Sequence, residues 1–161
     1  MAEVVNPRDS SRTLNVGIVF DGGSQKSYLT QRVKNSLALP VGSKQYLSIA
    51  AFGSRKGRPK QCEVVHLSVR TKHGSSQDLE VFVVPHICDP VTSPASVACS
   101  KMYHQLPQLD LADVCLDESL EIDLLIGSDF YWNFVTGEII RGDNGPVAIN
   151  TTLGWMSKSS P

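Results

Sequence analysis

The residues best placed to do chemistry are an aspartate and the small residues that follow it. Asp21 ends an apolar run, residues 16–20, and is followed by Gly22, Gly23 and Ser24. A carboxylate on a tight turn at the end of a buried strand is partly desolvated and surrounded by backbone N–H groups, which prepares it for acid–base work. Asp-Gly is also the commonest hairpin turn, so this motif alone favours a plain turn.

A second apolar run supplies the other half of the pattern. Residues 124–127 read Leu-Leu-Ile-Gly and are predicted to close another buried strand. Together with the Asp-x-Gly turn, this run resembles the signature of aspartic proteases in the half-size form of the retropepsins.

The resemblance extends over roughly residues 13–156. It is carried by FDGGSQKSYLT (20–30), LALPV (37–41), AFGSRK (51–56), VVPHIC (83–88), IDLLIGSDFYW (122–132) and VTGEIIRGDNGPVAINTTLGW (135–155). These blocks are similar to the protease domain of Bel/Pao-type retrotransposon polyproteins.

The resemblance implies a closed-barrel, retropepsin-like acid protease fold with one lobe per chain. It makes Asp21 the catalytic residue of an aspartic endopeptidase, and it implies no metal and no cofactor. One catalytic aspartate per chain then requires a homodimer that brings two copies of Asp21 together. The substrate is a polypeptide, expected to be the polyprotein that contains the domain.

The resemblance also assigns residues that bind substrate. Gly23 corresponds to the loop glycine whose backbone approaches the catalytic dyad and the peptide, and Ser24 and Gln25 fall where the loop contacts the substrate main chain. Phe52 and Gly53 lie in a hairpin that corresponds to the flap, a mobile cover that excludes water.

Three residues support the loop, and one of them departs from the family. Ile126 and Gly127 are expected to pack beneath it, whereas Gly22 stands where the family usually has Ser or Thr. In retropepsins that hydroxyl hydrogen-bonds across the dimer, and each lost bond costs about 0.5–1.5 kcal/mol. We therefore expect a weaker dimer and reduced activity. The alternatives are a non-catalytic dimerisation or peptide-binding module of the same fold, and an unrelated β domain.

Other polar and aromatic residues have plainer interpretations. Asp129 could be a second catalytic carboxylate, but a helix N-cap is favoured, and Asp123 is expected to point outward. An aromatic cluster is expected to belong to the core, and a basic loop to be a solvated flap tip. The cluster is Phe130, Tyr131, Trp132 and Phe134, and the basic residues are Arg55, Lys56, Arg58 and Lys60.

The sequence contains four residues that could bind zinc, but they are irregularly spaced. These ligands would be His86, Cys88, Cys99 and His104, whose spacing matches no usual zinc pattern. We therefore expect no metal.

Periodicity predicts a small, mainly β domain with one or two short helices. Strands are predicted at 13–20, 45–52, 62–71, 79–85 and 122–127, with a hairpin of 138–141 and 146–150. Residues 129–134 suit a short helical turn, and residues 87–118 are expected to be irregular.

A longer helix is predicted after the Asp-Gly-Gly turn. Leu29, Val33 and Leu37 recur every four residues, and Ser24 or Ser27 can cap the helix. The two glycines before it are expected to allow a positive φ.

Composition limits the class of protein. The 161 residues fit one domain, and the net charge of −1 supplies no field that steers the chain to nucleic acid or an acidic membrane. We expect a flexible leader or linker at 1–12, the protease domain at 13–156 and a tail at 157–161. The polar first residues lack the apolar core of a signal peptide, so we expect a cytoplasmic location with reduced cysteines.

Overall fold

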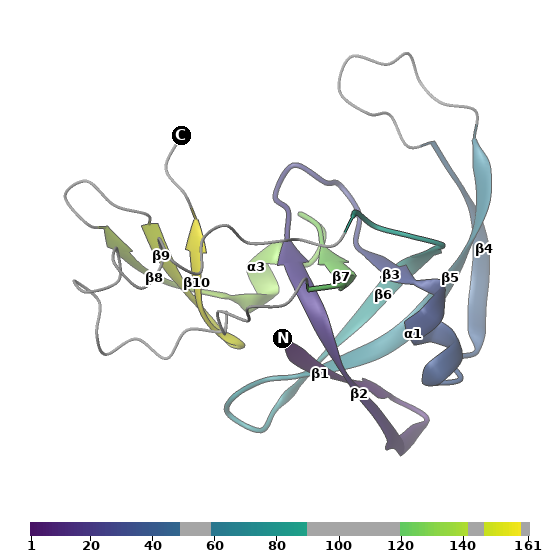
Figure 1. The fold of residues 1–161 in the computed structure, drawn as a ribbon, viewed down its shortest axis with the longest axis horizontal. Helices are drawn as coiled ribbons and strands as arrows, with labels where there is room; N and C mark the ends of the chain where they lie inside the picture. Colours follow the sequence, from purple (N-terminus) through teal and green to yellow (C-terminus); the bar gives the residue numbers. More distant parts are fainter. Residues whose placement is uncertain (49–58, 90–119, 142–146, 159–161) are drawn as a thin grey trace.

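The part of the chain that the structure describes folds mainly as β-strands, with two short helices (Figure 1). The structure is a computed structural model that describes residues 1–48, 59–89, 120–141 and 147–158. Its elements are β1 (Ala2–Asn6), β2 (Asp9–Phe20), β3 (Tyr28–Thr30), α1 (Gln31–Ser36), β4 (Val41–Leu47), β5 (Lys60–Arg70), β6 (Ser76–Val84), β7 (Ile122–Ile126), α3 (Tyr131–Phe134), β8 (Val135–Arg141), β9 (Val147–Thr151) and β10 (Gly154–Lys158).

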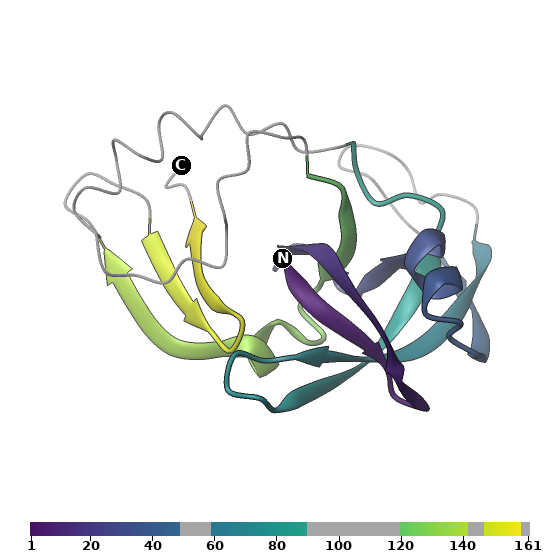
Figure 2. The ribbon, with the colours of Figure 1, turned by 60° about the horizontal axis from the view of Figure 1, so that its bottom comes forward.

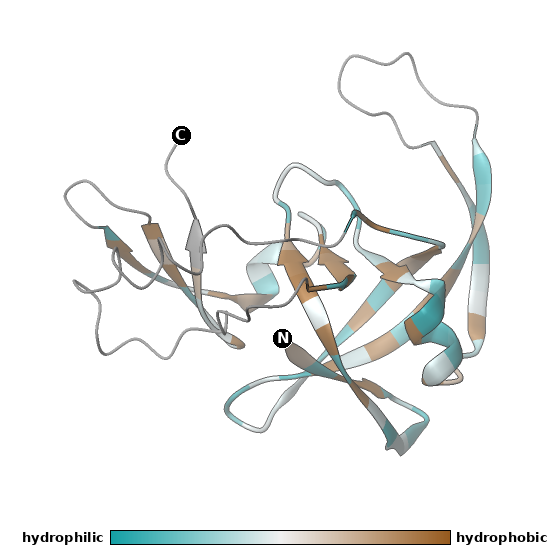
Figure 3. Cartoon of the chain, in the orientation of Figure 1, coloured by the Kyte–Doolittle hydropathy of each residue, from teal (hydrophilic) through white to brown (hydrophobic). Residues whose placement is uncertain are grey.

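Seven strands form the main sheet in the order β1-β2-β7-β3-β6-β5-β4. β1 also pairs with β5. Six of these strands, all except β4, are therefore linked in a continuous ring of pairings. β2–β7 and β3–β6 are parallel, and the other pairs are antiparallel. Apolar residues recur along these strands (Figure 3), and those that face inward form one core.

A second sheet of three strands, β10-β9-β8, follows α3. Figure 2 shows it on one side of the main sheet, at the opposite end of the molecule from β4. Two hydrogen bonds tie it to the rest of the chain: Lys72 N donates to Thr152 O, and Thr152 N donates to Phe134 O, both at 2.9 Å. Phe134 and Leu153 extend the common core into this junction.

The first residues are not a flexible leader, and that prediction is wrong. β1 pairs with β2 and β5, and Val4 and Val5 are buried. The buried side chain of Asn6 donates to Leu37 O at 3.0 Å, which ties β1 to the end of α1. Val4 and Val5 are buried because β1 pairs along one edge with the next strand, β2, and along the other with β5, which is distant in the sequence.

The helix predicted after the Asp-Gly-Gly turn is also different. Residues 28–30 form β3, which pairs with β6 and β7, and the helix is restricted to α1. Neither Ser24 nor Ser27 caps it, because its N-cap position is Thr30. Leu29 therefore belongs to a strand that is paired on both edges, and this pairing outweighs the four-residue spacing of the apolar residues. Only Val33, in α1, and Leu37, at its C-cap, keep the predicted helical positions.

The other predicted elements agree in type with the structure. β2, β5, β6, β7, α3 and the β8–β9 hairpin confirm their predictions, while β4 begins earlier than predicted and residues 49–52 lie outside the described part. Most of residues 87–118 lies outside it too. The tail prediction is wrong at its start, because β10, which was not predicted, runs to Lys158. In the described ranges, no helix has both the length and the apolar character needed to cross a membrane.

Candidate active site

Asp21 leaves the sheet where two parallel strands end together. Phe20 of β2 lies opposite Ile126 of β7, and Asp21 N donates to Ile126 O at 2.9 Å. The chain then turns sharply, with Ser24 N donating to Asp21 O at 3.1 Å. Gly23 N donates to Asp21 Oδ1 at 2.9 Å, so the carboxylate is oriented by the loop that it begins.

The Asp21 side chain is exposed in the single chain. Among the described residues, no hydrogen bond reaches its second carboxylate oxygen. The predicted partial desolvation and shell of several N–H groups are therefore not found here, since one backbone N–H contacts the carboxylate. The site as it stands is half covered: the loop lies behind Asp21 and solvent lies in front.

The two glycines after Asp21 do not use a left-handed backbone. Positive φ occurs at Gly74, Gly137 and Gly154, so the predicted positive φ at Gly22 and Gly23 is wrong. A Cβ at Gly22 would meet nothing within 4 Å, whereas one at Gly23 would lie 3.2 Å from Asp21 Oδ1. The loop thus tolerates a side chain at Gly22 on steric grounds.

Gly127 packs against the backbone of the loop. A Cβ there would lie 2.3 Å from Lys26 O and 2.9 Å from Ser24 O, distances that no real side chain reaches. Glycine is needed because the loop backbone approaches this closely. Ile126, the preceding residue, is completely buried.

The predicted substrate-binding residues are only partly within the described chain. Ser24 is half-buried, its Oγ donates to Lys26 O at 2.8 Å, and its carbonyl accepts from Ser128 N at 2.8 Å. Gln25 is exposed beside it. Phe52 and Gly53 lie outside the described residues, although β4 and β5 form the two arms of the predicted hairpin, with Leu47 opposite Lys60.

Asp129 does not cap α3. The N-cap position of α3 is Phe130, and no side chain caps it. Instead, Asp129 accepts two hydrogen bonds from Ser27, one from the backbone N at 3.1 Å and one from Oγ at 2.7 Å. The N-cap prediction is therefore wrong, and a contact between the loop and the end of β7 was missed.

Tyr28 follows this loop and was not singled out from the sequence. Its ring centroid lies 6.3 Å from that of Phe82, and burial raises the pKa of its phenol. The only sequence signal was its position directly after the loop. Its polar end lies near Ser24 and Asp129, so it is part of the wall beside the loop.

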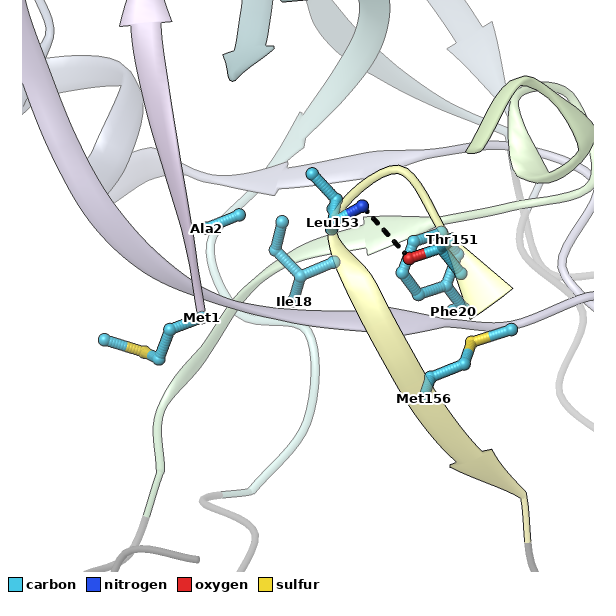
Figure 4. Close-up of a pocket in the computed structure, with 7 residues that line it drawn as sticks. All are labelled: Met1, Ala2, Ile18, Phe20, Thr151, Leu153 and Met156. Atoms are coloured by element: carbon cyan, nitrogen blue, oxygen red, sulfur yellow. Dashed lines mark hydrogen bonds between the residues drawn. The ribbon is translucent and has the colours of Figure 1, made fainter. Parts of the chain in front are cut away.

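An apolar pocket lies beside the strand that carries Asp21 (Figure 4). Ile18 and Phe20 of β2 line one side, and the turn at Leu153 and Met156 of β10 line the other. Ala2, the exposed Met1 and Thr151 complete the lining. Apart from Thr151, the side chains that line the pocket are apolar.

Asp123 is buried, so the prediction that it points outward is wrong. Its side chain is 4% exposed, accepts from Thr30 Oγ1 at 2.7 Å and forms an ion pair with Arg32. The carboxylate tolerates burial because both partners satisfy it.

The aromatic cluster divides between core and surface. Phe134 is fully buried and packs edge-on against Phe20, as predicted for a core residue. Trp132 is 73% exposed, so the core interpretation is wrong for that residue.

The residues described by the structure contain no group of three or more His, Cys, Asp or Glu that could hold a metal. His86 and Cys88 are both exposed, and Cys99 and His104 of the proposed zinc set lie outside those residues. Most of the basic loop, including Arg55, Lys56 and Arg58, also lies outside. Cys62 and Cys88 are not in disulfides.

These features define a mainly β domain with an exposed carboxylate held on a tight loop where two parallel strands end. The chain matches, over residues 2–160, the model of the family described as "Putative peptidase (DUF1758)", and it belongs to that family of peptidase domains. It matches no curated protein and no solved structure.

Proposed function

We propose that this domain is an aspartic endopeptidase whose catalytic residue is Asp21, paired with its copy in a homodimer. The observation that carries the proposal is the exposed carboxylate of Asp21, oriented by Gly23 N at 2.9 Å at the end of β2, in a chain of a peptidase family. The sequence resemblance to the retropepsin-like domain of Bel/Pao polyproteins supplies the aspartic type. It also suggests the natural substrate, the polyprotein itself, and an intracellular setting.

Two features of the fold are compatible with this proposal. The pairing of β1 with both β2 and β5 is compatible with a closed barrel of the retropepsin type. The β4–β5 hairpin is compatible with a flap that covers a bound peptide. Gly23, Ser24 and Gln25 lie on the same loop as Asp21, where a peptide main chain would pass.

In the dimer, two Asp21 carboxylates face each other and share one proton, because two like charges about 3 Å apart cannot both ionise. The pair titrates as a unit. One member removes a proton from a bound water, which attacks the scissile carbonyl, while the other gives its proton to the carbonyl oxygen. As the C–N bond breaks, the first member passes the water's proton to the leaving amine, and the second takes a proton back from the tetrahedral intermediate, which restores the shared proton of the pair. Neither a metal nor a cofactor takes part in this scheme.

A second candidate is a dimerisation or peptide-binding module without catalysis. It is favoured by Gly22, which lacks the hydroxyl that joins the two loops in retropepsins. In this alternative the fold and the loop are kept, but the two carboxylates are not held firmly enough for proton transfer.

The test is cleavage of an unfolded polypeptide by purified residues 1–161 at high concentration, from pH 4 to 7. Asp21→Asn is compared with Asp123→Asn, which changes a carboxylate outside the loop, and a transition-state-mimicking aspartic protease inhibitor is included. Cleavage that rises with the square of protein concentration and disappears only with Asp21→Asn or inhibitor is the expected result. No cleavage by a folded dimer would favour the module.

A further inference from the structure

We propose that Asp129 is a positioning residue that holds the loop of residues 21–27 in the geometry that Asp21 needs. This role rests on the function proposed above. Asp129 Oδ2 accepts from Ser27 N at 3.1 Å, and Asp129 Oδ1 accepts from Ser27 Oγ at 2.7 Å. Both donors belong to one residue, 102 positions earlier in the chain, so a single side chain fixes the point where the loop ends.

Ser27 is well suited to be that anchor. It is fully buried, its Oγ accepts from Gly127 N at 2.9 Å, and its carbonyl accepts from Phe82 N at 3.0 Å. With the two bonds to Asp129, every polar group of Ser27 is hydrogen-bonded. Moving Ser27 would leave several buried groups unpaired at once, so the anchor has one favoured position.

The segment that ends β7 holds the loop at three points. At the start, Asp21 N donates to Ile126 O at 2.9 Å, and in the middle Ser128 N donates to Ser24 O at 2.8 Å. These two contacts are made by the backbone. The third contact, at the end of the loop, is made by the Asp129 side chain, and it is the one that a substitution can remove.

The contact requires a carboxylate rather than any polar side chain. An ionised carboxylate only accepts hydrogen bonds, and its two oxygens match the two donors of Ser27. Hydrogen bonds to a charged acceptor are also stronger than neutral ones. Asp129→Asn keeps the size of the side chain but presents an NH₂ group to one of the two donors, so it loosens the anchor with little change in packing.

The matched control is Asp123→Asn. Asp123 also accepts from a hydroxyl of a distant residue, Thr30 Oγ1, at the same distance of 2.7 Å, but it does not contact the loop. At concentrations that keep the protein dimeric, Asp129→Asn should lower kcat by about tenfold to a hundredfold at nearly unchanged KM, because misplacing a catalytic group by about 1 Å costs up to this much. Asp123→Asn should leave kcat within about twofold of the unsubstituted enzyme.

Amide hydrogen exchange provides a readout that does not depend on catalysis. The amides of Gly23, Ser24 and Ser27 should exchange at least several-fold faster in Asp129→Asn than in Asp123→Asn. Unchanged exchange of these amides, or an unchanged kcat, would overturn the positioning role even if Asp21→Asn abolishes cleavage.

The two proposals fail in different ways. If the unsubstituted protein shows no Asp21-dependent cleavage, the proposed function fails, and the exchange comparison still decides whether Asp129 holds the loop. If Asp129→Asn does not fold, Ser27→Ala replaces it, because that change removes the hydroxyl that donates to Asp129, together with the acceptor of Gly127 N. Normal kcat and normal loop exchange in folded Ser27→Ala would equally overturn the proposal.

Discussion

Gly22 provides the sharpest test of the dimeric site, through the change Gly22→Ser. A Cβ at this position meets nothing within 4 Å, and Gly22 does not have a positive φ, so the folded chain accepts a side chain without strain. Replacing a glycine at such a site restricts the unfolded chain and stabilises the fold by about 0.4–1 kcal/mol. We expect this gain in the free energy of unfolding for Gly22→Ala as well as for Gly22→Ser.

The hydroxyl should act only in the dimer. If the serine hydroxyl at position 22 reaches the partner loop, two symmetric bonds form, each worth about 0.5–1.5 kcal/mol. The total of about 1–3 kcal/mol corresponds to a dimer Kd roughly 5 to 150 times lower than that of Gly22→Ala. Cleavage per chain at low concentration should rise in parallel, since more of the protein is dimeric.

Gly22→Ala is therefore the matched control, because it adds the Cβ without the hydroxyl. Dimer Kd is measured by sedimentation equilibrium, and the free energy of unfolding by urea denaturation. Equal Kd values for the Ser and Ala variants would refute the trans-loop hydrogen bond. A loss of stability in both variants would refute the conclusion that the space around Gly22 is open.

Three further changes test the loop and its surroundings. Gly127→Ala places a Cβ 2.3 Å from Lys26 O, so the free energy of unfolding should fall by about 1–3 kcal/mol. Calorimetry should show this as a Tm lower by about 2–4 °C for each kcal/mol. An unchanged Tm would contradict this packing. Burial raises the pKa of Tyr28, so the folded state favours the neutral phenol, and the free energy of unfolding should fall as the pH rises above the ordinary pKa of 10.0. In urea titrations at alkaline pH, Tyr28→Phe should show a smaller fall than the unsubstituted protein. The hydrogen-bonded Lys34 ammonium lowers the pKa of Glu63. The stability that this pair contributes is therefore present above the ordinary pKa of 4.5 and is lost as the pH falls below it. Glu63→Gln should lose less stability than the unsubstituted protein between neutral and acid pH, and equal losses would show that the pair contributes nothing.

The features that could be predicted from the sequence are the local ones. The alternation and apolar content of residues 13–20 and 122–126 depend only on neighbouring residues, and both segments are strands. The turn after Asp21 follows from Asp-Gly-Gly in the same way. Gly127 could be placed beneath the loop because the family pattern puts a glycine there, although its contact with Lys26 could not be derived from spacing.

The features that were missed depend on residues far apart in the chain. The burial of β1 follows from its pairing with β5, more than sixty positions later, and this pairing has no local signal in the sequence. Asp123 and Asp129 resemble ordinary surface carboxylates in sequence. Their partners lie 93 and 102 positions away, so neither the burial of one nor the anchoring role of the other has a local signal.

The contacts that hold Asp21 and its loop lie on one side of the loop, and the other side is exposed. Behind the loop, Gly127 fills the space and Asp129 satisfies Ser27, so those groups are fully engaged and are not available to act on a substrate. In front, Asp21 has one carboxylate oxygen bonded to Gly23 N and the other exposed. Acid–base cleavage of a peptide needs a second group that holds the complementary proton. This need supports the proposed homodimer, in which a two-fold axis in front of the loop would bring the second Asp21 against the exposed oxygen.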